Sequence, residues 1–193
     1  MQTSFQQHIG FFKESLRNIR ATGSIAPSSQ TLCRRIVAQI DPATAQVVVE
    51  LGPGDGVITK QLLERLRPDA RLILFEVNPV FVAHIEAKIQ DPRLVIIHDG
   101  AENMALHFQQ LGIESVDYVI SGIPFVMLPE SLAWTITREC RRWLRPGGQF
   151  VQFHYNPIML NLYRRVFGNA YIDFVARNVP PAFVIVCEKR IEN

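Results

Sequence analysis

The chain has 193 residues, of which 48% are hydrophobic and 20% charged, and its formal net charge is +2. This length and apolar content fit one globular domain with a sizeable core, which excludes a disordered protein. No uncharged apolar run approaches the roughly 18 residues that a membrane-spanning helix needs, and the opening MQTSFQQHIG lacks the features of a secretory signal. The three cysteines are far apart and odd in number, which argues against a disulfide framework.

The first 20 residues predict an amphipathic helix. Large apolar side chains recur at spacings of four, three, four and three residues, so they share one narrow stripe of a helix, and basic side chains flank that stripe. The stripe consists of Phe5, Ile9, Phe12, Leu16 and Ile19, and the flanking residues are Lys13, Arg17 and Arg20. Such a helix either lies in an anionic membrane surface or covers a ligand cleft. We expect residues 1–28 to form an N-terminal amphipathic helix that acts as a substrate or membrane lid.

Residues 29–193 alternate strand and helix patterns. Strands are predicted at residues 46–51, 71–76, 94–98, 116–121, 149–154, 171–177 and 182–188, and helices at 57–66, 79–89, 131–144 and 158–167. Continuous apolar strands separated by helices indicate a parallel sheet covered on both faces. The last two strands are joined by the short Asn-Val-Pro-Pro connection, which favours antiparallel pairing. The prediction is a single α/β domain with seven strands.

Charged residues are unevenly distributed along this pattern. Residues 138–165 carry six arginines and one acidic residue, and residues 1–40 are also basic. If these two segments meet in space, they form a patch for an anionic partner. The alternative is two separate, solvated helix faces.

The ends of the predicted strands carry the candidate ligand contacts, because ligands of open α/β sheets bind outside the carboxyl ends of the strands. The first strand ends in Glu50 and a G-x-G-x-G loop at residues 52–56, where a ligand can approach the backbone closely. The second strand ends in Glu76, whose carboxylate can accept both hydroxyls of a ribose. The third is followed by Asp99, which can accept a hydrogen bond from an exocyclic amine such as that of adenine.

This glycine spacing, preceded by a glutamate, differs from the G-x-G-x-x-G of a dinucleotide fold. The sequence resembles class I S-adenosylmethionine-dependent methyltransferases from about residue 47 to residue 187. The resemblance implies a Rossmann-like methyltransferase sheet, mostly parallel with an antiparallel C-terminal strand, and S-adenosylmethionine as cofactor. The implied cofactor-binding residues are Glu50, Gly52, Gly54, Gly56, Glu76, Asp99 and Ser121. A purely structural role beneath the loop is the alternative for Glu50.

No metal site is expected, because the cysteines and histidines lack metal-ligand spacing and methyl transfer needs no metal. We expect His107, like His8 and His84, to be a packing or surface residue.

The fourth strand leads into the segment SGIPF at residues 121–125, where the methyl acceptor meets the cofactor in such folds. Enzymes that methylate the exocyclic amine of adenine carry Asn or Asp at the position of Ser121, so a nucleic-acid partner is not expected. The related ribosomal RNA dimethyltransferases resemble the chain in the glycine loop but carry a helical C-terminal domain, for which we expect no room here. An rRNA adenine N-methyltransferase and a non-catalytic cofactor-binding module remain the alternatives.

A second resemblance covers nearly the whole chain. The segments TGSIAPSS (22–29), ELGPGDG (50–56), SGIPF (121–125), LRPGGQFVQF (144–153) and NVPPA (178–182) together resemble the bacterial phospholipid N-methyltransferases. That family methylates phosphatidylethanolamine toward phosphatidylcholine. Ala21, where the family commonly has Lys, and HYN at 154–156, where it often has TYG, are departures that leave the lipid class and the degree of methylation open. The resemblance implies a phospholipid substrate and a cytoplasmic enzyme peripherally associated with the inner membrane.

Methylation of a headgroup amine needs a neutral amine and a site that tolerates a cationic product. Phe125 and Tyr155, at the ends of the fourth and fifth strands, are the candidates for an aromatic wall. His154 neighbours Tyr155 on a strand, so we expect it to face the other way as a buried structural residue. The predicted catalytic residues are Ser121, Phe125 and Tyr155, and the predicted substrate and membrane contacts are Phe5, Phe12, Lys13, Arg17 and Arg20.

Overall fold

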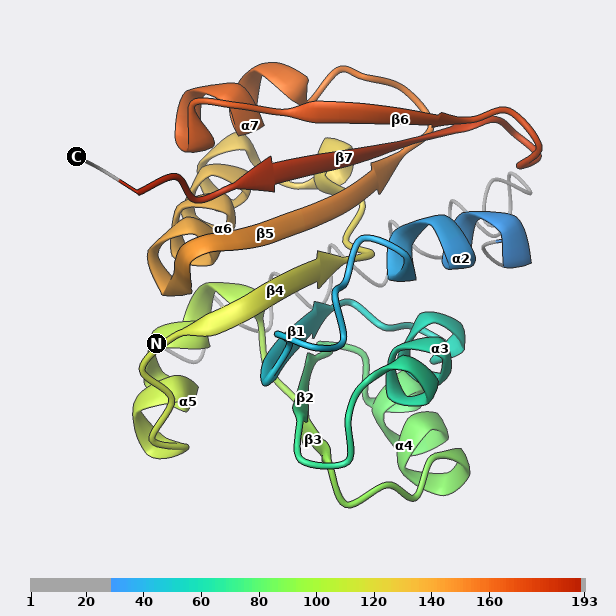
Figure 1. Cartoon of the computed structure of the whole chain (residues 1–193), viewed down its shortest axis with the longest axis vertical. Helices are drawn as coiled ribbons and strands as arrows, with labels where there is room; N and C mark the ends of the chain where they lie inside the picture. Colours follow the sequence, from blue (N-terminus) through green and yellow to red (C-terminus); the bar gives the residue numbers. More distant parts are fainter. Residues whose placement is uncertain (1–28, 192–193) are drawn as a thin grey trace.

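The computed structural model describes residues 29–191. The predicted N-terminal helix and its five substrate or membrane contacts lie outside the described residues. Residues 29–191 form a sheet of seven strands between two layers of helices (Figure 1). None of the helices in this range combines the length and the apolar character that crossing a bilayer requires.

The order of the strands across the sheet is β3-β2-β1-β4-β5-β7-β6, and β7 runs antiparallel to both of its neighbours. This confirms the predicted fold class and the antiparallel pairing of the last two strands. The strands are β1 (Val47–Leu51), β2 (Arg71–Phe75), β3 (Leu94–Ile97), β4 (Val116–Ser121), β5 (Leu144–His154), β6 (Tyr171–Val175) and β7 (Ala182–Glu188). The helices are α2 (Gln30–Val37), α3 (Val57–Arg65), α4 (Pro79–Lys88), η1 (Ala101–Asn103), α5 (Met104–Gln110), η2 (Phe125–Met127), α6 (Glu130–Trp143) and α7 (Leu160–Phe167).

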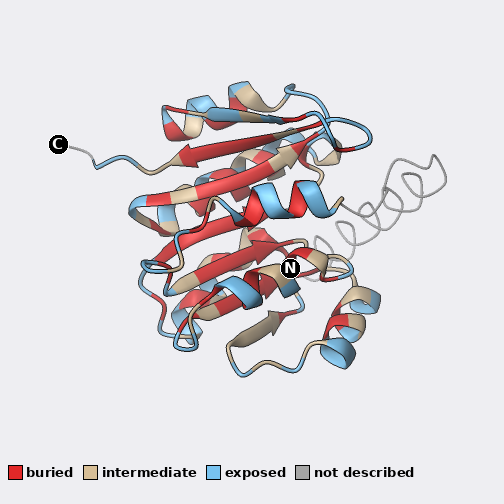
Figure 2. Cartoon of the chain, turned by 45° about the vertical axis from the view of Figure 1, so that its right-hand side comes forward, coloured by how far each residue is buried: buried red, intermediate tan, exposed pale blue. Residues whose placement is uncertain are grey.

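The central strands of the sheet are buried on both faces (Figure 2), because helices cover both sides and successive side chains of a strand point to opposite sides. On β1, Val48 belongs to the core beneath α2, α3 and α4, whereas Val49 belongs to the core beneath α5, α6 and α7. Both side chains are fully buried. The continuous apolar strands predicted from sequence therefore serve two cores at once.

Two helices and part of one strand were not predicted. Helix α2 begins where the side chain of Ser29 accepts a hydrogen bond from the backbone N–H of Leu32 at 3.2 Å, and it buries an apolar stripe that includes Leu32 and Ile36. Helix α5 has two turns and buries Met104 and Phe108. Strand β5 begins at Leu144 rather than at residue 149, because the expected Arg-Pro-Gly-Gly turn is absorbed as a register shift between β4 and β5.

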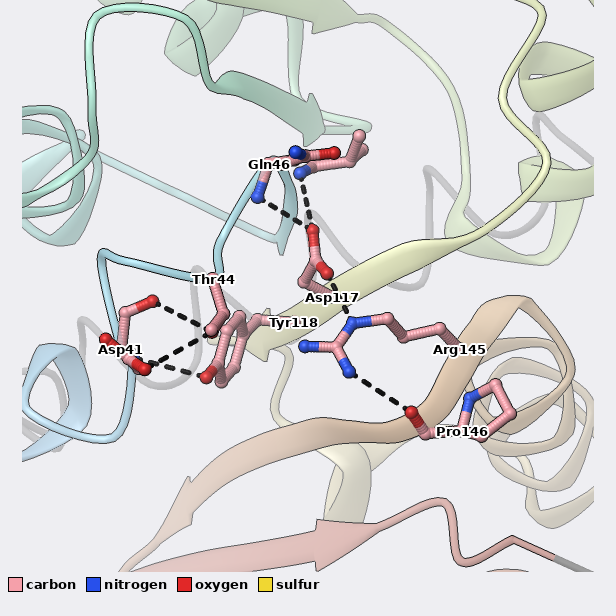
Figure 3. Close-up of polar contacts among 8 residues, drawn as sticks. Asp41, Thr44, Gln46, Asp117, Tyr118, Arg145 and Pro146 are labelled. Atoms are coloured by element: carbon pink, nitrogen blue, oxygen red, sulfur yellow. Dashed lines mark hydrogen bonds and ion pairs between the residues drawn. The ribbon is translucent and has the colours of Figure 1, made fainter.

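The amino ends of the central strands are tied together by Asp117, which is 8% exposed. Its Oδ2 accepts hydrogen bonds from the backbone N–H groups of Gln46 and Val47 at 2.8 Å each, and its Oδ1 lies 2.5 Å from Nε of Arg145 (Figure 3). Next to it, the hydroxyl of Tyr118 accepts from the backbone N–H of Asp41 at 3.2 Å. These bonds join the starts of β1, β4 and β5 at the edge opposite to the glycine loop.

Candidate active site

A pocket opens at the carboxyl edge of the sheet, where the sequence predicts it. Its lining brings Gly52, Glu76 and Asp99 together from the ends of β1, β2 and β3. The structure therefore places one predicted cofactor residue from each of three successive strands around a single pocket.

The glycine loop lies close against the segment that follows β4. The backbone N–H of Gly122 donates to the carbonyl of Leu51 at 2.8 Å, and a Cβ on Gly122 would lie only 2.8 Å from the carbonyl oxygen of Gly52. Gly52 itself has φ +66°, and a Cβ there would lie 3.2 Å from Cγ1 of Ile123. Only glycine combines this backbone conformation with this close approach.

Glu76 is the acidic group at the floor of the pocket and is 2% exposed. Its Oε2 accepts from the N–H of Gly54 at 3.2 Å and its Oε1 from the N–H of Asn78 at 2.8 Å. Burial raises the pKa of Glu76, while the hydrogen bonds from the backbone of Asn78, Gly54 and Val77 oppose that shift. The carboxylate thus couples the end of β2 to the glycine loop while it lines the pocket.

Asp99 is oriented by a set of partners that sequence analysis missed. Its Oδ1 accepts from the N–H of Gly100 at 2.7 Å and from Nδ2 of Asn103 at 2.8 Å, and its Oδ2 lies 2.7 Å from Nε2 of His107. Partial burial raises the pKa of Asp99, but the hydrogen bonds from His107, Asn103 and Gly100 outweigh it and lower the pKa overall. His107 is therefore a positioning partner of a pocket carboxylate, which corrects the expectation of a mere packing or surface residue. The signal is the spacing of Asn103 and His107 at four and eight residues beyond Asp99.

Glu50 lies beneath the glycine loop and is 1% exposed. Its Oε2 accepts from the hydroxyl of Thr59 on α3 at 2.7 Å. Burial raises the pKa of Glu50 to about 8; the Thr59 hydroxyl opposes this shift, and the charges of Glu76 and Asp55 add to it. These contacts join β1 to α3 below the loop, and Glu50 is not among the residues that line the pocket.

Gly54 and Gly56 complete the loop on the helix side. Both have positive φ, +58° and +79°, and Gly56 is the residue directly before α3. The first N–H group of α3, that of Val57, donates to Oδ1 of Asp55 at 3.4 Å, so it is not free, although the sequence pattern predicts free N–H groups at the start of this helix.

Ser121, the last residue of β4, and Phe125, the first residue of η2, lie on either side of the turn after β4, and both side chains are buried. Ser121 is 1% exposed, and its Oγ accepts from the N–H of Ile123 at 3.3 Å. Phe125 is also 1% exposed, with its ring 6.3 Å from that of Phe150 and 5.8 Å from that of Tyr163. An aromatic wall for a cation needs an open ring face, so this burial argues against the role expected of Phe125 and assigns its ring to the core.

His154 is the last residue of β5 and Tyr155 follows it; the ring of Tyr155 lies 6.2 Å from that of Phe153, whereas the ring of His154 lies 5.7 Å from that of Tyr163. His154 is 5% exposed, its Nε2 lies 2.7 Å from the hydroxyl of Tyr163, and burial lowers its pKa to about 4. It is the buried structural histidine that was predicted. Tyr155 is 37% exposed, and burial of its hydroxyl raises its pKa, although a hydrogen bond with the side chain of Asn178 opposes this.

The apolar walls of the pocket were not found from sequence. They come from the segment after β4 and from the first turns of α6, and they include Ile123, Leu128, Leu132 and Ile136. Apolar side chains at helical spacing are indistinguishable from core residues in a sequence, so no local signal marks them. Among residues 29–191, no cluster of His, Cys, Asp and Glu side chains is arranged to hold a metal ion.

The arginine-rich segment forms a basic groove at the amino edge, away from the pocket. The groove is lined by Arg138, Arg141, Arg142, Arg165, Lys189 and Arg190, together with Trp134, Pro146 and Val166. Some of its cations have protein partners: Arg138 lies over the ring of Trp134 at 5.0 Å, and Nζ of Lys189 donates to the carbonyl of Leu144 at 2.7 Å. Within the described residues, Arg34 and Arg35 of α2 lie on the other side of the sheet, so they do not join this groove.

Known proteins match this chain over most of its length. A family model described as a methyltransferase domain matches residues 48–148. The ornithine lipid N-methyltransferase of Singulisphaera acidiphila is 35% identical over 179 residues, which cover 92% of this chain and 91% of that protein. The ribosomal RNA small subunit methyltransferase A of Mycoplasma mycoides is 31% identical over 113 residues, which cover 56% of this chain and 40% of that protein.

A solved structure shows the same fold. The 1,6-didemethyltoxoflavin-N1-methyltransferase of Burkholderia thailandensis, solved with S-adenosylhomocysteine, has a TM-score of 0.72 and 14% identity, over 96% of this chain and 90% of that one. The chain belongs to the class I S-adenosylmethionine-dependent methyltransferases. Within that class, its nearly full-length match to a lipid N-methyltransferase agrees with the resemblance seen in the sequence.

The residues present fit S-adenosylmethionine. The pocket offers a buried carboxylate, Glu76, as an acceptor for ribose hydroxyls, and a second carboxylate, Asp99, beside apolar walls that suit an adenine ring. The glycine loop presents backbone without side chains at the carboxyl edge. When bound, the cofactor supplies an activated methyl group on a sulfonium.

Proposed function

We propose that this protein is an S-adenosylmethionine-dependent N-methyltransferase that acts on the headgroup amine of a membrane lipid. The proposed substrate is phosphatidylethanolamine, with its methylated forms, on the route to phosphatidylcholine. The observation that carries the proposal is the match to a lipid N-methyltransferase over nine-tenths of both chains, together with the cofactor pocket at the carboxyl edge. Because that relative is an ornithine lipid N-methyltransferase, ornithine lipid is the competing aminolipid.

Tyr155 is the proposed contact for the amine. It stands at the carboxyl end of β5 with 37% of its surface exposed, and its raised pKa keeps the phenol uncharged near neutral pH. A neutral hydroxyl can accept a hydrogen bond from the amine, and the ring face can stabilise the more cationic product. In-line transfer needs little else from the protein than correct positioning.

A methyl-transfer assay with labelled S-adenosylmethionine tests the proposed function. The purified protein is offered vesicles with phosphatidylethanolamine, vesicles with ornithine lipid, ribosomal RNA, or no acceptor. Label in phosphatidylethanolamine supports the proposal, and label in ornithine lipid alone reassigns the aminolipid. Label in RNA but not in lipid contradicts it, and cofactor binding without any transfer indicates a non-catalytic module.

We further propose that the enzyme works at the cytoplasmic surface of the inner membrane as a peripheral protein. A lipid substrate remains in the bilayer, so the pocket edge must approach the headgroups. Fractionation of cells that express the chain tests this: the protein should sediment with membranes and be released by salt or alkali, unlike an integral protein.

A further inference from the structure

Exposed apolar side chains gather on two loops at the edge of the sheet that carries the cofactor pocket. Ile158, in the connection between β5 and α7, is 72% exposed, and Val179, in the turn between β6 and β7, is 83% exposed. Tyr155 stands beside them with 37% of its surface exposed. Single exposed apolar residues are common on proteins, but several on adjoining loops of one edge can mark a contact surface.

The two loops are neighbours in space. In the β5–β7 pairing, His154 at the end of β5 lies opposite Phe183 near the start of β7. The connection that follows β5 and the turn that precedes β7 therefore emerge at the same edge of the sheet. Figure 1 shows the β6–β7 turn projecting beyond the tips of β4 and β5.

Local hydrogen bonds pair several polar groups of these loops, while the large apolar side chains are exposed to solvent. The backbone N–H of Ile158 donates to the side chain of Asn156 at 3.2 Å, and Nδ2 of Asn178 donates to the carbonyl of Pro180 at 2.5 Å. Asn178 is buried, whereas Val179 beside it is the most exposed of the large apolar residues in the described range. One exception to this pairing is Oδ1 of Asn178, which is buried and has no hydrogen-bond partner in the described part of the chain.

Two further features of this edge favour contact with a bilayer. Arg177, in the same β6–β7 turn, is exposed and can contact lipid phosphates at the level of the headgroups. The described chain begins at Ser29, at the end of α2 that lies toward this edge, so 28 further residues join the protein there (Figure 1). Their sequence combines the apolar and basic residues typical of membrane contact.

We propose that the β5–α7 connection and the β6–β7 turn form a membrane-docking surface, in which Ile158 and Val179 enter the interface of a bilayer that contains the aminolipid substrate. This surface turns the carboxyl edge of the sheet, and with it the cofactor pocket, toward the headgroups. The inference rests on the proposed function, because it assumes that the acceptor is a bilayer lipid.

The test compares the double variant Ile158→Ser/Val179→Ser with a matched control, Ile191→Ser. Ile191 is also 72% exposed, but it follows the other end of β7, at the amino edge. Removing an aliphatic side chain from an apolar contact costs about tenfold in affinity. We expect the double variant to bind vesicles of phosphatidylethanolamine and phosphatidylglycerol at least tenfold more weakly in co-sedimentation, and the control to bind as the wild type does.

Unchanged vesicle binding by the double variant would overturn the proposal, as would an equal loss in the Ile191→Ser control. A dimer of the lipid-free wild type that the double variant loses would assign the surface to a contact between copies of the chain instead. Thermal unfolding checks that all variants are folded, which we expect because the replaced side chains are exposed.

Methyl transfer to a short-chain phosphatidylethanolamine, dissolved as monomers, separates this inference from the proposed function. If both hold, the double variant loses transfer to vesicles and keeps transfer to the dissolved lipid. If vesicle binding is unchanged while lipids are methylated, the inference fails and the function stands. If the wild type methylates neither form, the proposed function fails, whatever the binding shows.

Discussion

Among single residues, Glu76 both holds the backbone around the pocket in place and offers a carboxylate to a ligand in it. It accepts hydrogen bonds from two backbone N–H groups and still lines the pocket. Glu76→Gln keeps the size of the side chain but removes the charge that would accept ribose hydroxyls. Because hydrogen bonds to a charged group contribute about 1.5–3 kcal/mol each, we expect affinity for S-adenosylmethionine to fall about 10- to 100-fold in calorimetry. Glu86→Gln, at an exposed site on α4, is the control and should bind normally.

We expect the free energy of unfolding to depend on pH through the protonation of Glu50. Burial raises its pKa from 4.5 to about 8 in the folded protein, so the folded state retains a proton that the unfolded state releases. Its contribution to stability is fully present below pH 4.5 and is lost as the pH rises through 8. Glu50→Gln keeps an acceptor for Thr59 and has no proton to lose. We expect the variant to be more stable than the wild type at pH 9 by on the order of 5 kcal/mol.

Denaturant unfolding of both proteins at pH 5, 7 and 9 measures this difference in the free energy of unfolding. The free energy of unfolding of Glu50→Gln minus that of the wild type should increase from pH 5 to pH 9. A difference that does not change with pH would show that Glu50 is ionised in the folded protein.

At the level of elements, the loop between β1 and α3 depends on Gly52. Replacing this glycine strains the backbone and also brings a side chain against Ile123. Gly52→Ala and Gly112→Ala both place a side chain at nearly the same positive φ, +66° and +64°, so both should lose about 1–2 kcal/mol of stability. Only the Cβ at Gly52 meets a neighbour, Ile123, and only Gly52 lines the pocket. We therefore expect cofactor affinity to fall in Gly52→Ala alone. Equal affinity in both variants would mean that the cofactor does not use this loop.

Across the whole molecule, the two edges of the sheet have different roles. The carboxyl edge holds the pocket, and the amino edge holds the Asp117 network, which includes the bonds to Gln46, Val47 and Arg145. Asp117→Ala leaves two backbone N–H groups unpaired in a nearly buried position. We expect it to lower the free energy of unfolding by about 2–3 kcal/mol and to leave the cofactor affinity of the folded protein unchanged.

Asp69→Ala is the matched control for Asp117→Ala. Asp69 also pairs with an arginine, Arg67, but on the exposed surface, where an ion pair contributes little to stability. Denaturant unfolding and calorimetry of both variants measure the two effects. A loss of cofactor affinity in folded Asp117→Ala would show that the edges are coupled.

The order of elements and the pocket's polar residues could be predicted because their signals are local. Apolar runs of strand length, the G-x-G-x-G loop and the acids at residues 76 and 99 are each read within a few neighbouring residues. The parallel sheet then brings strand ends to one edge, so separate motifs meet without any knowledge of side-chain contacts. Short elements such as α5 escaped prediction because their patterns are too brief to stand out.

The sequence by itself determined the fold class, the methyl donor and the edge of the sheet at which the pocket lies. The tertiary structure alone decided that Phe125 belongs to the core, that His107 orients Asp99, that Leu132 and Ile136 wall the pocket, and that Ile158 and Val179 are exposed. These facts depend on which segments pack against each other across the chain. Which side chains are buried, and which ones contact each other, is set by the packing of the whole folded chain. Periodicity and turn residues, in contrast, are properties of the local sequence.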